Sequence, residues 1–121
     1  MPGPTSTPVR VLMLTATAGF RHDSIATARQ VVTSLGASLG SGGGFSVTAT
    51  EDVASISAAT LANYDVLFFA LTSGELAFTA DQRAAILSFV ASGKGFLGAH
   101  SATDTLYEWP EYGALIGAYF K

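Results

Sequence analysis

Four short apolar runs, separated by loops and segments of helical periodicity, constrain the fold of this chain more than any other feature. The runs that we expect to form strands are residues 9–14, 45–50, 65–71 and 95–99. Their β-branched and aromatic residues are typical of buried strands. Strands that alternate with helices form parallel sheets with right-handed crossovers. We therefore predict a flavodoxin-like, three-layer α/β/α fold with a parallel sheet in the strand order 2-1-3-4.

The first helix is predicted from an apolar periodicity that follows a polar loop. Asp23 or Ser24 can supply the side-chain oxygen of an N-terminal cap. The apolar positions that share one helical face are Ile25, Ala28, Val32 and Leu35. Gly36 is expected to end this helix, and the glycine-serine segment 40–44 then connects it to the second strand.

Capping signals predict three further helices. A short helix over residues 57–64 begins at a capping serine. Thr79 and Gln82 have the spacing of a capping box, and the helix that they begin stops at Gly93. Pro110 begins a short final helix, because proline is favoured in the first helical turn.

The composition limits the classes of function that the chain can have. Its 121 residues suffice for one domain, which we assign to residues 9–121 after a flexible leader at residues 1–8. A net charge of −3 argues against a nucleic-acid partner, and the lack of cysteine excludes disulfides, thiolate metal sites and cysteine nucleophiles. The start lacks the pattern of a signal peptide, and no apolar run could span a bilayer. We expect a cytoplasmic protein without a membrane partner.

Polar side chains gather after the strands that the predicted topology makes neighbours. In open parallel sheets, ligands bind beyond the carboxyl ends of the strands, where the strand order reverses. Both histidines of the chain lie in these loops, together with three other candidates: Arg21, Ser73 and Asp104. We predict catalytic roles for His100, His22 and Asp104. Arg21 and Ser73 are predicted to bind a small-molecule substrate.

The segment Gly98–Ala102 resembles a nucleophile elbow, because small residues stand two places before and two places after the presented side chain. Here the presented side chain is that of His100. An imidazole accepts a proton, donates a hydrogen bond or binds a metal, and is seldom the final nucleophile. The alternative interpretation is that the small residues only permit close packing of a strand against a helix.

The other candidates also have plain structural alternatives. Asp104 either orients His100 by a hydrogen bond or caps a turn. Arg21 either anchors an anionic or hydroxyl-rich ligand, or it is a solvated loop cation or forms an ion pair with Asp23. His22 and His100 with a carboxylate would suit a metal-dependent hydrolase, which we keep as an alternative function. Because the chain has two histidines and no cysteine, we expect no bound metal or other cofactor.

Aromatic and acidic residues are concentrated behind the elbow. Trp109 and Tyr112 stand beside Glu108 and Glu111. Aromatic faces next to carboxylates suit the C–H faces and hydroxyls of sugars, so the two rings are predicted to form a sugar platform. The alternative is that they cover the end of the sheet as core. Asp104 with either glutamate is a candidate pair for glycosidase chemistry, but sequence spacing does not give the separation that such chemistry needs.

Three blocks of sequence carry a family resemblance. They are Gly19–Ile25, Gly95–Thr105, and Trp109–Tyr112 with Gly117–Phe120. In this order, and over residues 9–120, they resemble the ThuA family of trehalose-utilisation-type domains with a class I glutamine amidotransferase-like fold. The resemblance implies a role in the bacterial metabolism of trehalose or a related disaccharide or keto-sugar, with the carbohydrate bound at the carboxyl ends of the strands.

The resemblance does not decide whether the chain is an enzyme or a binding module. It is compatible with an enzyme of glycoside hydrolase or isomerase type, and with a non-catalytic interaction or ligand-binding module. Glutamine amidotransferases carry a cysteine at the elbow, where this chain has His100. Glutaminase activity is therefore not expected.

The resemblance also implies that the domain is truncated at its C-terminus. Members of the ThuA family usually continue for about as many residues again, with further strands and a closing helix. This chain would then correspond to the N-terminal part of the family domain. Its fourth strand would be an uncovered apolar edge, so we expect either a homo-oligomer or a further C-terminal segment that covers that edge.

Overall fold

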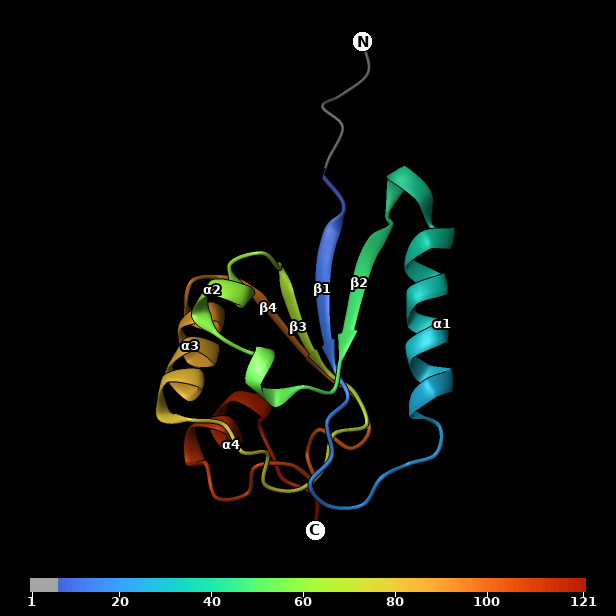
Figure 1. The fold of residues 1–121 in the computed structure, drawn as a ribbon. Coiled ribbons are helices and arrows are strands. Elements are labelled where there is room, and N and C mark those ends of the chain that lie inside the picture. Colours follow the sequence, from blue (N-terminus) through green and yellow to red (C-terminus); the bar gives the residue numbers. More distant parts are fainter. Residues whose placement is uncertain (1–6) are drawn as a thin grey trace.

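Four parallel strands form one sheet with helices on both of its faces (Figure 1). The computed structural model describes residues 7–121, so most of the predicted leader lies outside the described residues. The strands are β1 (Val9–Leu14), β2 (Phe45–Thr50), β3 (Val66–Phe69) and β4 (Gly95–Gly98). Their order is β2-β1-β3-β4, and every neighbouring pair is parallel. The predicted α/β fold and strand order are confirmed.

The helices lie in two layers. They are α1 (Ile25–Ser38), α2 (Ala58–Leu61), α3 (Ala80–Ala91) and α4 (Pro110–Ile116), with short 3-10 turns η1 (Gly40–Gly42) and η2 (Val53–Ser55). Helix α1 covers one face of the sheet, and α2, α3 and α4 cover the other face (Figure 1). Each face therefore has an apolar core of its own.

The two cores follow from the alternation of side chains along β1. Leu12 and Leu14 point into the larger core, on the side of α2, α3 and α4. Val11 and Met13 point into the smaller core beneath α1. All four side chains are buried, because β1 lies between β2 and β3 and is covered on both faces.

The predicted caps on one side of the sheet are present. The Ser57 side chain accepts a hydrogen bond from the backbone N–H of Thr60 at the start of α2, although this helix is shorter than predicted. Thr79 and Gln82 form a reciprocal capping box at the start of α3. Gly93 follows the end of α3 with φ of +102°, a left-handed conformation that favours glycine.

Helix α1 differs from its prediction at both ends and on its apolar face. Ser24 occupies the N-cap position, but its side chain makes no capping hydrogen bond. Gly36 does not end the helix, which continues to Ser38. A Cβ atom at Gly36 would lie 2.3 Å from the carbonyl oxygen of Phe45, so this glycine permits close contact between α1 and β2. Leu35 is 51% exposed and does not belong to the buried face.

An ionic cluster joins three strands at the amino edge of the sheet. The Asp65 carboxylate, just before β3, accepts hydrogen bonds from the backbone and guanidinium of Arg10 at 2.8–3.2 Å. It also accepts one from Lys94 Nζ at 3.3 Å. The hydrogen bonds from Arg10 hold the pKa of Asp65 well below its usual range. The cluster therefore links the starts of β1, β3 and β4.

Strand β4 is an open edge of the sheet with an exposed apolar side chain. Leu97 is 51% exposed on the face that α1 covers only in part. It lines an apolar pocket of about 290 Å³ together with residues of β1, β3 and α1. Within residues 7–121, no helix combines the length and the apolar character needed to cross a membrane.

Candidate functional site

Three loops meet at the carboxyl edge of the sheet. They are the β1–α1 loop (residues 15–24), the central loop between β3 and α3 (70–79) and the β4–α4 loop (99–109). The central loop bonds to both others through its backbone. The N–H of Ala18 donates to the carbonyl oxygen of Ser73 at 2.8 Å, and the N–H of Gly74 donates to that of Asp104 at 2.9 Å.

Ser73 and Gly74 hold the β1–α1 loop in place from beneath. The Ser73 side chain is 1% exposed, and its hydroxyl donates to the carbonyl oxygen of Phe20. Gly74 has φ of +75°, and a Cβ atom there would lie 2.5 Å from the backbone nitrogen of Gly19. Ser73, a predicted substrate-binding residue, is therefore placed below the surface as an anchor for the loop.

Buried hydroxyl groups fix the turn that presents His100. Thr105 Oγ1 donates to the carbonyl oxygen of Ser101 at 3.0 Å, so it accepts the hydrogen bond from Thr72 Oγ1 at 2.9 Å. The Ser101 hydroxyl donates to the carbonyl oxygen of Thr72. Leu71, with φ of +56°, donates its N–H to the carbonyl oxygen of His100. Such strained positions are held by their surroundings and cluster at functional sites.

The elbow itself resembles the predicted turn in its packing but not in its backbone conformation. A Cβ atom at Gly98 would lie 3.0 Å from the Cβ of Ala102 and 2.9 Å from Ile116, so a small residue is required there. His100 is not among the described residues with positive φ. In a nucleophile elbow the backbone strain falls on the presented residue. Here the positive φ lies instead at Leu71, whose N–H donates to the carbonyl oxygen of His100.

The structure brings His22 and His100 into contact, as the topology predicted. Their Nε2 atoms are 3.0 Å apart, although 78 positions separate them in the sequence. The ring centroids are 4.6 Å apart, and the ring planes meet at 63°. In the neutral pair, one Nε2 is protonated and donates to the other. We call His22 and His100 the histidine pair.

The histidine pair opens into a pocket of about 200 Å³. Its lining residues are Phe20, His22, His100, Ser101, Thr103, Asp104 and Phe120. Phe20 and Phe120 are 69% and 62% exposed, so a large part of each side chain is open to a ligand. The ring of Phe20 also meets His22 edge-to-face, with ring centroids 4.8 Å apart. Both lie within the blocks of family resemblance, but an aromatic residue of the core gives the same sequence signal, and sequence reasoning did not select them.

Asp104 lines this pocket but is tied to a neighbour other than His100. Its Oδ1 lies 2.7 Å from the hydroxyl of Tyr107, and this hydrogen bond raises the pKa of Tyr107 to about 12. Among the described residues, no hydrogen bond joins the Asp104 carboxylate to His100. In this structure Tyr107, rather than His100, therefore holds the carboxylate.

Arg21 lies in the same loop as His22 but faces another pocket. Its guanidinium lies 2.6 Å from Glu51 Oε1 in an ion pair and 3.4 Å from the hydroxyl of Thr17. The ion pair that the alternative interpretation assigned to Asp23 is thus made with Glu51. With Glu51 and Glu75, Arg21 lines a pocket of about 370 Å³ that the histidine pair does not line.

Trp109 and Tyr112 lie in the core instead of forming the predicted sugar platform. They are 4% and 0% exposed and stack on each other with ring centroids 5.9 Å apart. The Tyr112 hydroxyl donates to the carbonyl oxygen of Ala102, and burial raises the pKa of Tyr112 above its ordinary value. Tyr112 also stacks on Phe69 of β3, and the guanidinium of Arg83 lies over the ring of Trp109, so neither ring is placed to receive a ligand.

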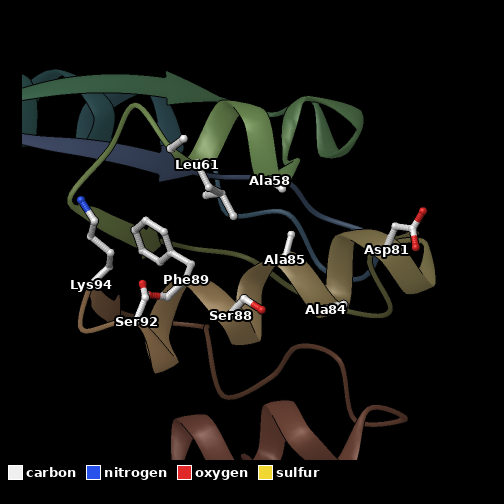
Figure 2. A pocket seen from close by; sticks show the side chains of 10 residues that line it. Ala58, Leu61, Asp81, Ala84, Ala85, Ser88, Phe89, Ser92 and Lys94 are labelled. Carbon is white, nitrogen blue, oxygen red and sulfur yellow. The ribbon is translucent and has the colours of Figure 1, made fainter.

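A larger groove lies between α2 and α3 (Figure 2). Its volume is about 670 Å³, and alanine and serine side chains make up much of its lining. Asp81 and Lys94 stand at its two ends (Figure 2). The groove brings together none of the predicted site residues.

Comparison with known proteins identifies the family. Residues 10–121 match the ThuA family, which is described as trehalose utilisation. The chain belongs to the ThuA family. Among curated proteins, no sequence matches it.

A ThuA-like protein from Bacteroides uniformis, known from a crystal structure, has the same fold. The TM-score is 0.65 at 21% sequence identity. The matched region covers 97% of this chain and 47% of that protein. The chain thus spans about half the length of this ThuA-like structure, and both members of the histidine pair lie within the ThuA match.

Proposed function

We propose that the chain acts in the utilisation of trehalose or a related disaccharide or keto-sugar, and that the histidine pair is its acid/base centre. The observation that carries the proposal is the 3.0 Å contact between the two Nε2 atoms at the mouth of a pocket. The pair lies beyond the carboxyl ends of the strands, where ligands bind in sheets of this topology. The family description, trehalose utilisation, supports the choice of a sugar as substrate.

The pair is suited to a coupled proton transfer. The unprotonated Nε2 accepts a proton from a sugar hydroxyl or from a carbon next to a carbonyl group. The protonated Nε2 of the partner ring donates its proton to the sugar oxygen on which negative charge develops. The pair keeps the same number of protons, because one ring gains the proton that the other loses. This chemistry is of isomerase type.

The lining of the pocket favours this chemistry over that of a glycosidase. Glycosidases generally use two carboxyl groups on opposite sides of the scissile bond. Asp104 is the one carboxylate among the lining residues, and Tyr107 holds it. The exposed rings of Phe20 and Phe120 offer apolar faces for the C–H groups of a sugar.

Exchange of substrate protons with solvent tests the proposal. The chain is incubated in D₂O with a keto derivative of trehalose, and deuterium uptake at the carbon next to the carbonyl group is followed by NMR. Trehalose itself has no carbonyl group and is the control substrate, which should take up no deuterium at carbon. Loss of a general acid or base typically slows a reaction by about 10²–10⁴-fold, so His22→Ala and His100→Ala should each slow the uptake by at least about 100-fold. Asp23→Asn, a change next to His22 at an exposed position, should retain the wild-type rate.

Two outcomes would overturn the proposal. One is wild-type exchange in both histidine variants. The other is sugar binding by the wild-type chain, detected by calorimetry, without any exchange or turnover. That second result would identify a non-catalytic binding module.

A further inference from the structure

From the geometry of the histidine pair we infer that His22 and His100 together bind a divalent transition-metal ion through their Nε2 atoms. The inference goes beyond the acid/base proposal and does not depend on it, because it uses the positions of two nitrogen atoms and no property of a sugar. An ion bound by both Nε2 atoms would replace the proton shared between them, so the metal-bound pair would not carry out the proposed proton transfer. The two rings come from different loops, and both loops are fixed by the buried contacts of Ser73, Thr72 and Ser101.

The spacing of the two nitrogens matches a shared metal ion. Imidazole nitrogens bind such ions at about 2.1 Å. Two nitrogens held at a right angle around the ion are then about 3.0 Å apart, and two at the tetrahedral angle are about 3.4 Å apart. The observed separation of the Nε2 atoms is 3.0 Å. The pair therefore has the spacing of neighbouring ligands in octahedral or square-planar coordination.

The relative orientation of the rings supports the same conclusion. In a straight hydrogen bond of this length, both rings would point along the line between the nitrogens, and their centroids would be about 5.3 Å apart. The observed centroid separation is 4.6 Å, with the ring planes at 63°. At least one ring axis is therefore tilted away from the line between the nitrogens. Two rings whose axes meet at a right angle on a shared ion would have their centroids about 4.6 Å apart, so the observed separation fits a shared ion.

The available ligands indicate which ions would bind. Imidazole suits nickel, copper and zinc, whereas magnesium and calcium prefer oxygen ligands. The right-angle spacing favours Ni²⁺ and Cu²⁺ over tetrahedral Zn²⁺, which should bind to the same two nitrogens with lower affinity. Within residues 7–121, no cluster of three or more histidine or acidic residues is placed to hold a metal ion. The remaining coordination positions would therefore be filled by water or by oxygen atoms of a ligand in the pocket.

Calorimetric titration of the tag-free chain with NiCl₂ alone tests the inference. We expect one Ni²⁺ per chain, and at least a tenfold loss of affinity in His22→Ala and in His100→Ala. MgCl₂ should give no binding. Asp23→Asn is the matched control: it removes a negative charge beside His22 but no nitrogen ligand, and it should bind Ni²⁺ like the wild type. Equal binding by wild type and both histidine variants would refute the inference, as would an equal loss in the control.

A second measurement uses the wild-type chain, so it does not depend on the folding of a variant. The chain has two histidines, which give separate imidazole C–H signals in a proton NMR spectrum. Diamagnetic Zn²⁺ should shift both sets of signals over the same range of concentration, because one ion contacts both rings. A response from one ring alone, or from neither, would contradict a shared ion. Neither measurement contains a sugar. A negative result would therefore refute metal binding without affecting the acid/base proposal, which the deuterium-exchange experiment tests separately.

Discussion

At the scale of single residues, the candidate site depends on small, buried residues beneath the two loops that carry the histidines. Ser73 and Gly74 lie beneath the loop that carries His22, and the Thr72–Ser101–Thr105 hydroxyl network lies beneath the turn that carries His100. These small, buried groups determine how close the loops approach. The geometry of the exposed rings is therefore a consequence of packing below them.

Ser73→Ala should lower stability and loosen the histidine pair. The change removes the hydrogen bond to the carbonyl oxygen of Phe20, so we expect the free energy of unfolding to fall by about 1 kcal/mol. Urea unfolding measures this loss, and Ni²⁺ titration should show weaker binding. Ser38→Ala removes an exposed hydroxyl that donates to Leu35 far from the site, and should change neither quantity appreciably. Unchanged stability and Ni²⁺ affinity in Ser73→Ala would contradict the anchoring role.

At the scale of elements, the contact between α1 and β2 depends on Gly36. No side chain fits there without moving the carbonyl group or the ring of Phe45. Glycine has two structural roles in helices, because it both ends them and allows close packing inside them. Gly36 has the second role, since α1 continues past it and packs closely against β2 there.

Gly36→Ala tests this packing against helix propensity. Alanine favours a helix over glycine by about 1 kcal/mol, but overpacking typically costs about 1–3 kcal/mol, so we expect a net loss of stability. Thermal or urea unfolding shows whether the free energy of unfolding rises or falls. Gly42→Ala is the control, because a Cβ atom there meets no atom within 4 Å. A more stable Gly36→Ala protein would refute the close contact.

The strands, their order and the meeting of His22 with His100 could be predicted because each follows from a local pattern or a general topological rule. Strand identity follows from apolar runs, and the position of the site follows from the carboxyl ends of parallel strands. The roles of aromatic residues could not be predicted in this way. Trp109 and Phe20 give the same apolar signal, yet Trp109 is buried beneath α4 and Phe20 is exposed beside the pocket. Tertiary packing makes this distinction.

At the scale of the whole molecule, the carboxyl and amino ends of the strands have different roles. The carboxyl edge gathers the candidate site, and the amino edge is held by Asp65 with Arg10 and Lys94. Because the three groups come from the starts of three strands, their ion pairs support the sheet as a unit. They lie at the opposite end from the histidine pair.

The stability of the chain should therefore depend on pH through Asp65. Its pKa is lower in the folded chain than in the unfolded chain, so its contribution is complete above the unfolded value of about 4 and is lost as the pH falls below it. Urea unfolding between about pH 2 and pH 6 should give a steeper loss of stability for wild type than for Asp65→Asn. Parallel curves would contradict this assignment.

The 78 positions that separate His22 from His100 have a consequence for folding. An ion bound by both rings would link the loop after β1 to the end of β4, as a reversible cross-link would. In the unfolded polypeptide the two imidazoles are far apart, so its affinity for the ion would be lower. Nickel would thus select the native chain, and its melting temperature would climb with the concentration of free ion.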